Sequence, residues 1–214
     1  IDEFSASSGA IVQEGAASFD VASGKTLVYS GTAISLGANT LTIAGEGSIS
    51  STNALVLENA DRQLTITGSS VLSGAQVTTA LTTGIVISES STITTLTLGD
   101  TTPVSIAADK TLSGTVVVNS GGTLQLTGSG SLVSAVTLNG GTLDIDQTLA
   151  INGAITHSAS SSIDVAQDKT LTYSGTALSL GEYTLTLTGG GTLSNTNSLT
   201  LGNASSVLNV AGPN

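Results

Sequence analysis

The segment GKTLVYSGTAISLG at residues 24–37 recurs as DKTLTYSGTALSLG at residues 168–181, and this recurrence decides the fold. The duplication extends without a gap over residues 19–60 and 163–204, where 26 of 42 aligned positions are identical. A looser third copy begins at Ile106 with IAADKTLSG and continues into GGTLQLTGSGSL. Internal repeats of this kind are typical of proteins that stack similar structural units.

A shorter period of about 21 residues lies within the duplication. It is marked by apolar–polar–apolar triplets, whose middle residues are Asp20, Thr42, Thr65, Val86, Ser105, Gln125, Asp144, Asp164, Thr186 and Asn209. Two further series of aliphatic residues fall between the triplets. In phrases such as TLTI and TLQLT the apolar residues alternate with polar ones, which predicts strands rather than helices. We therefore expect an all-β chain with about three short strands in each coil.

A single coil of three short strands cannot bury its own inward side chains, but stacked coils can. Each strand would then pair in parallel with its equivalent one coil away, at about 4.8 Å. We predict one parallel β-helix domain over residues 1–214, with an irregular lead-in at 1–18 and nine to ten coils over 19–212. An antiparallel sandwich is the alternative fold, but its strands need not recur in sequence.

Composition excludes several classes of function. Without Cys, the chain has neither disulfides nor a Cys-ligated zinc site. Its net charge of −11, with only four basic residues, argues against nucleic acid and anionic lipid as partners. No apolar run approaches the roughly 18 residues of a membrane span, so no membrane insertion is expected. The chain begins with Ile1 and shows no signal peptide, so we expect a piece of a longer protein.

The phrases GGTLQLTGSGSL and LGANTLTIAGEGSI resemble coils of large bacterial surface proteins. These are autotransporter passengers, filamentous-haemagglutinin-like exoproteins and repeat adhesins, and the resemblance covers the chain from about Phe19 onward. It implies a right-handed parallel β-helix at the bacterial cell surface or outside the cell. It also implies a non-enzymatic stalk or adhesive module, flanked by further coils of a parent chain. Surface glycans, or the surface of a host or neighbouring cell, would be the partners.

Acidic residues form the one candidate site. Asp144 and Asp164 are the middles of consecutive triplets, with Asp146 two residues further on, so stacking brings their strands to about 4.8 Å. This separation suits a calcium ion or the carboxyl pair of a retaining glycosidase. However, Asp20, the repeat partner of Asp164, faces Thr42 in this register, and no D-x-D-x-D-G loop is present. We expect a solvated acidic stripe, with a weak calcium site as the alternative, and no catalytic residue.

Other single residues are expected to be structural. His157, the only His, lies where a third strand should end, so we expect an exposed corner residue and no Ser–His–acid triad. Tyr29 and Tyr173 occupy equivalent places in the duplicated segments. They should point inward, with their hydroxyls reaching backbone carbonyls or water.

Three alternative functions remain open. The first is a polysaccharide-binding or polysaccharide-processing protein, although aromatic residues for sugar stacking are scarce. An ice-binding solenoid would need an unbroken Thr ladder, and a trimeric fibre shaft would need outward apolar columns. The available Thr pairs and outward valines are separated along the chain: Thr40, Thr42, Thr65, Thr67, Thr184 and Thr186, and Val56 and Val117.

Overall fold

A computed structural model describes residues 5–9, 11, 13, 15–31, 34–35, 39–51, 53, 55–57 and 63–211. This part of the chain folds as a parallel β-solenoid of 27 strands, with no helix among the described residues. It therefore contains no helix long and apolar enough to cross a membrane. The predicted all-β class and the parallel stacking of short coils are confirmed.

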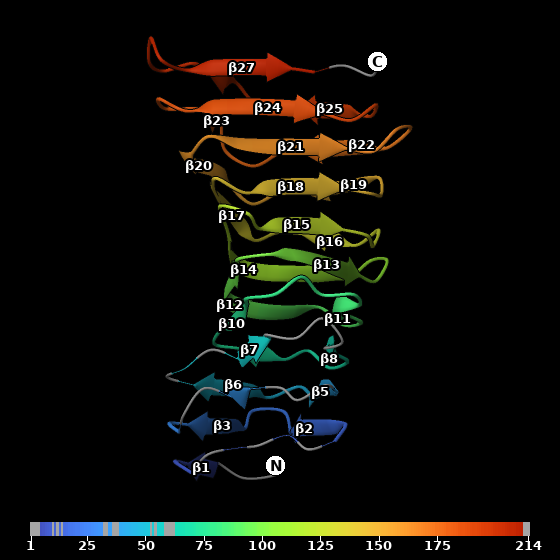
Figure 1. Cartoon of the computed structure of the whole chain (residues 1–214). Coiled ribbons are helices and arrows are strands. Elements are labelled where there is room, and N and C mark those ends of the chain that lie inside the picture. Colours follow the sequence, from blue (N-terminus) through green and yellow to red (C-terminus); the bar gives the residue numbers. More distant parts are fainter. Residues whose placement is uncertain are drawn as a thin grey trace.

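Face 1 of the solenoid is a ten-stranded parallel sheet that rises from the N-terminal end to the C-terminal end (Figure 1). Its strands, in order, are β2 (Ala17–Val21), β5 (Thr40–Gly45), β8 (Gln63–Ile66), β11 (Gly84–Ile87), β13 (Thr101–Ile106), β15 (Thr123–Leu126), β18 (Thr142–Ile145), β21 (Ser161–Val165), β24 (Thr184–Thr188) and β27 (Val207–Val210). Nine steps of about 4.8 Å give a rod about 43 Å long.

Face 2 and face 3 share a fifteen-stranded sheet, because two long strands cross from one face to the other. These are β12 (Ser91–Leu98) and β14 (Thr111–Asn119). Face 2 also contains β1 (Ser5–Ser7), β3 (Thr26–Tyr29), β6 (Ser48–Ser51), β9 (Val71–Leu72), β16 (Ser131–Leu132), β19 (Leu149–Ile151), β22 (Thr170–Tyr173) and β25 (Thr192–Asn195). Face 3 contains β4 (Ile34–Ser35), β7 (Leu55–Leu57), β10 (Ala75–Val77), β17 (Ala135–Asn139) and β20 (Ile155–Ala159), and the separate pair β23 (Leu178–Ser179) and β26 (Leu199–Thr200).

The interior consists of vertical columns of aliphatic side chains. Alternation along each strand sends one set of residues inward and the other set outward. One column on face 1 contains Leu41, Leu64, Ile85, Val104, Leu126, Ile145 and Val165, and none of these is more than 4% exposed. The expected stacking of branched aliphatic residues is confirmed.

Three predicted vertical pairs on face 1 are wrong by two residues. Thr42 lies over Ser18 rather than Asp20, and Thr186 lies over Ser162 rather than Asp164. In the middle of the rod, Gln125 pairs with Pro103 rather than Ser105. A slip of two residues leaves the same side chains facing inward, so hydrophobic alternation does not distinguish the two registers.

The repeated K-T-L phrase begins at a tight turn. The backbone N–H groups of Lys25, Lys110 and Lys169 donate to carbonyls three residues earlier, at 3.0, 3.1 and 3.0 Å. The residue before each lysine has a positive φ: 71° at Gly24, 61° at Asp109 and 60° at Asp168. Gly adopts this conformation freely and Asp tolerates it, which explains why these two residue types alternate at one place in the repeat.

Tyr29 and Tyr173 are fully buried, as predicted. Each hydroxyl accepts a hydrogen bond from a backbone N–H, that of Ile11 at 3.3 Å and that of Ile155 at 3.0 Å. The hydroxyl bonds predicted to backbone carbonyls or water stay a prediction, and the partner that the structure shows is a backbone N–H. Because the phenol oxygen is satisfied internally, a large polar aromatic residue fits inside a narrow core.

Candidate functional site

The three candidate carboxylates lie in the C-terminal half of face 1. Asp144 on β18 and Asp164 on β21 are direct register partners in adjacent parallel strands. Asp146 follows β18, where its backbone N–H donates to the carbonyl of Leu126 at 3.0 Å. The predicted stacking of Asp144 with Asp164 is confirmed, and Asp146 adds a third carboxylate close to the end of β18.

Two of the three carboxylates are held by a neighbouring polar side chain. Asp146 Oδ2 accepts a hydrogen bond from Gln125 Nε2 at 2.8 Å, and Asp164 Oδ1 accepts one from Thr188 Oγ1 at 2.5 Å. Within the described residues, the Asp144 side chain makes no comparable bond. Asp144 is therefore the carboxylate whose partial burial is least offset by hydrogen bonds from other side chains.

Asp144 is correspondingly the most perturbed acid of the group. Partial burial is the largest cause, and together with the negative charges of Asp146 and Asp164 it raises the pKa of the Asp144 carboxyl from 3.8 to about 6. A carboxyl with a raised pKa beside an ionised one can act as a proton donor near neutral pH. Among the described residues, however, no three His, Cys, Asp or Glu side chains are arranged to hold a metal ion. Calcium binding by Asp144, Asp146 and Asp164 stays a prediction.

We expect Asp144→Asn to raise the free energy of unfolding at pH 7 by about 1–2 kcal/mol, after allowance for solvent screening. The folded-state pKa of about 6 exceeds the ordinary 3.8, so the carboxyl favours folding only while it is protonated. That contribution is complete below pH 3.8 and is lost as the pH rises through 6. The advantage of the Asn variant should therefore grow between pH 4 and pH 7 in urea unfolding measurements.

Asp109→Asn is the matched control, because it removes the same charge from an exposed turn that tolerates Asn. It should change stability little at any pH between 4 and 7. An equal gain from both variants would mean that overall negative charge, rather than the surroundings of Asp144, sets the effect.

A second surface lies at the corner between face 1 and face 2, in the N-terminal half of the rod. It has two shallow hollows, of about 200 and 180 Å³, which meet at the exposed side chain of Val71. We call this surface the hydroxyl corner. Its lining residues come from five successive coils: Gly24, Lys25, Thr26, Glu46, Gly47 and Ser48, then Ser69, Ser70, Val71, Ser90, Ser91, Thr92, Thr111 and Ser113.

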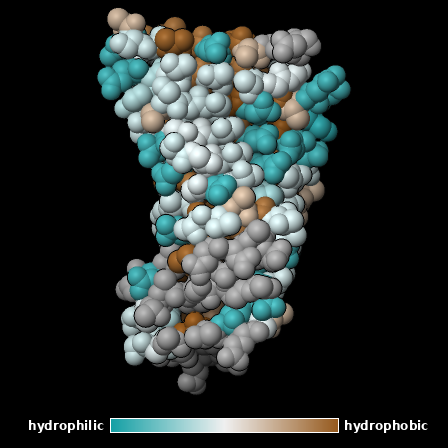
Figure 2. Space-filling model, in the orientation of Figure 1, coloured by the Kyte–Doolittle hydropathy of each residue, from teal (hydrophilic) through white to brown (hydrophobic). Residues whose placement is uncertain are grey.

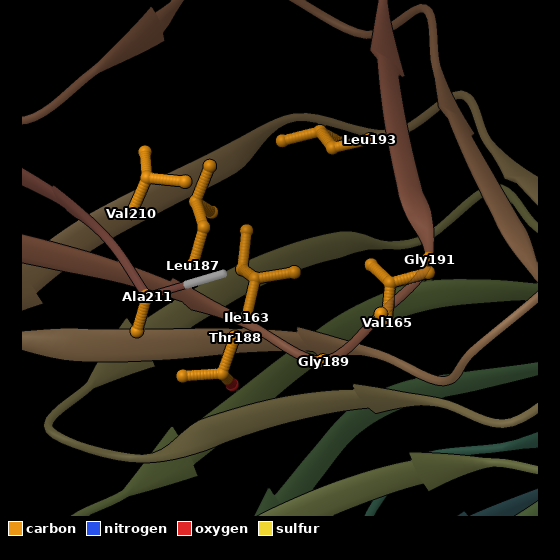
Figure 3. A pocket seen from close by; sticks show the side chains of 10 residues that line it. Ile163, Val165, Leu187, Thr188, Gly189, Gly191, Leu193, Val210 and Ala211 are labelled. Atoms are coloured by element: carbon orange, nitrogen blue, oxygen red, sulfur yellow. The ribbon is translucent and has the colours of Figure 1, made fainter. Parts of the chain in front are cut away.

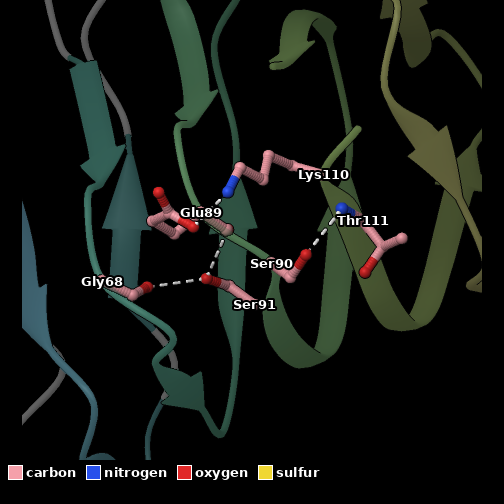
Figure 4. Close-up of polar contacts among 6 residues, drawn as sticks. All are labelled: Gly68, Glu89, Ser90, Ser91, Lys110 and Thr111. Carbon is pink, nitrogen blue, oxygen red and sulfur yellow. Dashed lines mark hydrogen bonds and ion pairs between the residues drawn. The ribbon is translucent and has the colours of Figure 1, made fainter. Parts of the chain in front are cut away.

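Hydrogen bonds between coils fix many of these hydroxyls. Thr26 Oγ1 lies 2.8 Å from Ser48 Oγ, and Thr92 Oγ1 lies 2.7 Å from Ser113 Oγ. Ser91 Oγ lies within hydrogen-bond distance of two backbone carbonyls (Figure 4), those of Gly68 at 2.9 Å and Glu89 at 2.8 Å. Hydrogen bonds therefore hold these hydroxyls in fixed positions; Ser91 is itself buried, whereas Thr26, Ser48, Thr92 and Ser113 are partly exposed.

One ion pair borders the hydroxyl corner. Lys110 Nζ lies 2.6 Å from Glu89 Oε2, and the neighbouring Ser90 Oγ accepts a hydrogen bond from the Thr111 N–H at 3.1 Å (Figure 4). Both charged side chains are partly exposed, so the pair adds little to stability. The pair places one ammonium group and one carboxylate beside a surface that otherwise consists mainly of hydroxyl groups.

The hydroxyl corner was not among the sites predicted from the sequence. Its signal was the pair of Ser-Ser phrases at 69–70 and 90–91, which are 21 residues apart and therefore occupy equivalent places in adjacent coils. In a chain this rich in Ser and Thr the phrases are not distinctive, and only the folded backbone shows that they border a hollow.

The prediction that His157 is an exposed residue at a corner is wrong. Its strand does not end there but continues to Ala159, and His157 pairs with the buried Leu138. Both imidazole nitrogens are buried, and neither has a hydrogen-bond partner in the described part of the chain. Burial lowers the pKa of the imidazole below its ordinary value. With no Ser or acid bonded to either nitrogen, His157 is an inward packing residue and not part of a triad.

We expect the natural chain to lose stability in mild acid because of His157, and we expect His157→Leu to lose less. Because the folded-state pKa of His157 is lowered, the unfolded chain takes up a proton first as the pH falls below about 6.5. The stability present above that pH is then lost as the pH falls through the folded-state value. Urea midpoints at pH 8 and pH 5 should differ less in His157→Leu than in the natural chain. The same difference in both proteins would show that the imidazole is solvated.

The outward Thr ladder on face 1 is short. Thr42 pairs with Thr65, but Val86 occupies the next position along the rod. On face 3, Val117 lies between Thr97 and Thr137, so the outward valine stands in a polar column.

Comparisons of the chain with protein-family models, with curated proteins and with solved structures give no match.

Proposed function

We propose that the chain is a non-enzymatic stalk and adhesive module of a larger protein on the outside of a bacterial cell. The observation that carries this proposal is the continuous ten-stranded face, whose interior is filled by aliphatic columns from coil to coil. In such a solenoid each coil contacts only its neighbours, so added coils lengthen the rod without changing its cross-section. The resemblance to autotransporter passengers and repeat adhesins supports the same role.

The hydroxyl corner supports the adhesive part of the proposal. Ordered Ser and Thr hydroxyls both donate and accept hydrogen bonds, as sugar hydroxyls do, and the exposed Val71 offers an apolar contact between the two hollows. Shallow hollows of this size give weak binding at a single site. Many copies on one surface would convert weak contacts into firm attachment, and surface glycans of a host or neighbouring cell are the proposed partners.

The test compares single and multiple display of the full chain. Monomers in solution should bind polysaccharide no more tightly than millimolar, whereas beads carrying many copies should adhere to a polysaccharide-coated surface. Val71→Asp should weaken adhesion of the beads, and Val133→Asp is the control, because it places the same charge on another exposed valine. Equal adhesion of both variants would contradict a role for the hydroxyl corner, and micromolar binding by the monomer would favour a lectin.

A polysaccharide-processing enzyme is the second candidate, and the raised pKa of Asp144 beside Asp146 and Asp164 favours it. It makes a separate prediction: release of reducing ends from a polysaccharide, lost in Asp144→Asn and kept in Asp109→Asn. The stalk proposal requires no such release from the natural chain.

A further inference from the structure

The end of the rod formed by β24, β25, β26 and β27 leaves large aliphatic side chains in solvent. Leu199, Leu201 and Val210 are 41%, 54% and 66% exposed, and Val207 is also exposed. Figure 2 shows apolar residues gathered at this end of the molecule, where Figure 1 places β27. Elsewhere in the described part of the rod, the aliphatic residues at equivalent inward positions are buried.

A cavity opens into the interior at the same end. Its volume is about 280 Å³, and side chains of Leu187, Leu193 and Val210 line it together with Ile163 and Val165 from the coil below (Figure 3). Leu187 and Leu193 are only partly buried although they pack against the main core. The inward column of each face is therefore open to solvent above the last coil.

The duplication shows what covers the same surface elsewhere in the molecule. β27 lies on β24 in the register in which β8 lies on β5, with every residue 144 positions further along. The inner equivalents of Leu199, Leu201 and Val210 are Leu55, Leu57 and Ile66, which are 4%, 0% and 0% exposed. The two surfaces have nearly the same composition, and the inner one is sealed.

The inner surface is sealed by one more parallel coil. Ala75 and Val77 of β10 pair with the two leucines of β7. Ile85 and Ile87 of β11 pair with Leu64 and Ile66 of β8. The cover thus consists of extended segments with an aliphatic residue at every second position.

We propose that the end formed by β24–β27 is a docking surface for one further parallel β-coil of this type. The coil would place aliphatic side chains over Leu199 and Leu201 on face 3, and over Leu208 and Val210 on face 1. Within the described residues β27 pairs only with β24, so its other edge offers the unpaired backbone groups that such a coil would bond. This docking surface rests on the proposed stalk function, and a further coil would be the partner of this end of the rod.

The test extends the full chain after Asn214 with a copy of residues 71–98. The duplication aligns residues 212–214 with 68–70, so the copied β9, β10, β11 and β12 segments follow β27 at the natural spacing. Hydrogen exchange of the β27 amides should slow at least tenfold, and binding of a dye for exposed apolar surface should fall. The control extension carries Val77→Asp, Ile85→Asp and Ile87→Asp in the copied segment. It should leave both the exchange of the β27 amides and the dye binding as they are in the unextended chain.

Unchanged exchange of the β27 amides in the extended chain would overturn the proposal. Equal protection by the control extension would also overturn it, because aliphatic alternation would then be unnecessary. A third outcome is that the β27 amides of the unextended chain become protected as its concentration rises, and that the protein then has the mass of a dimer. The occupant of this end would in that case be a second copy of the chain, and the proposal of a further coil would be overturned. None of these measurements involves glycan binding, so a failure here is distinct from a failure of the adhesive proposal.

Discussion

Val118→Asp is expected to lower the free energy of unfolding by about 4 kcal/mol. Val118 is fully buried on β14, and its register partners Leu98 and Leu138 above and below are also fully buried. A carboxylate at this position would lose its hydration between the two leucines, so the fold would have to open or the group would have to be protonated. Urea unfolding followed by circular dichroism at pH 7 measures the loss.

The adjacent Val117 supplies a control of the same residue type on the same strand. It points outward between Thr97 and Thr137, so Val117→Asp should cost less than about 1 kcal/mol. Equal losses from the two variants would mean that the inward and outward sets are exchanged, because a shift of one residue reverses every side chain on a strand.

Gly114→Ala is expected to cost about 3 kcal/mol or more. Gly114 has a φ of 122°, and a Cβ atom there would lie 1.9 Å from the carbonyl oxygen of Ile93. This is the place where β12 and β14 bend from face 2 to face 3 and their register shifts, between Ile93 and Thr95. The backbone oxygen belongs to a paired strand and cannot move aside, so the thermal midpoint should fall by several degrees.

Gly24→Asp is the matched control, since it also replaces a glycine of positive φ. Gly24 has a φ of 71°, and nothing lies within 4 Å of the added Cβ. Asp109 and Asp168 already occupy the equivalent turns at 61° and 60°. The substitution should therefore change stability by less than about 0.5 kcal/mol. A large loss would show that the three turns are not equivalent.

Hydrophobic alternation and the duplication were sufficient to predict the parallel coils and the inward columns. Alternation has a period of two, however, so it leaves shifts of two residues undetermined. This is why Asp164 pairs with Thr188 rather than Thr186, and why Asp20 pairs with Ala44 rather than Thr42. Turn lengths between the strands settle the register, and these depend on local backbone conformation.

Prediction of the candidate sites was uneven for related reasons. The pair Asp144 and Asp164 was found because both residues are the middles of consecutive triplets, and the structure keeps that register. His157 was misplaced because the length of β20 was underestimated by two residues. The hollows beside Val71 depend on the path of the backbone at the corner between two faces. The residue types along the strands do not predict that path.

The two buried tyrosines give the molecule a pair of built-in optical probes. The chain has no Trp and only three Tyr, so its near-ultraviolet spectrum is dominated by very few side chains. Tyr29 and Tyr173 report on opposite halves of the rod, and each can be silenced singly by substitution with Phe. Because neighbouring coils hold one another in place, a linear array can melt either as one unit or inward from its termini. The near-ultraviolet signals of Tyr29 and Tyr173 during unfolding can therefore show which of the two occurs, without an attached label.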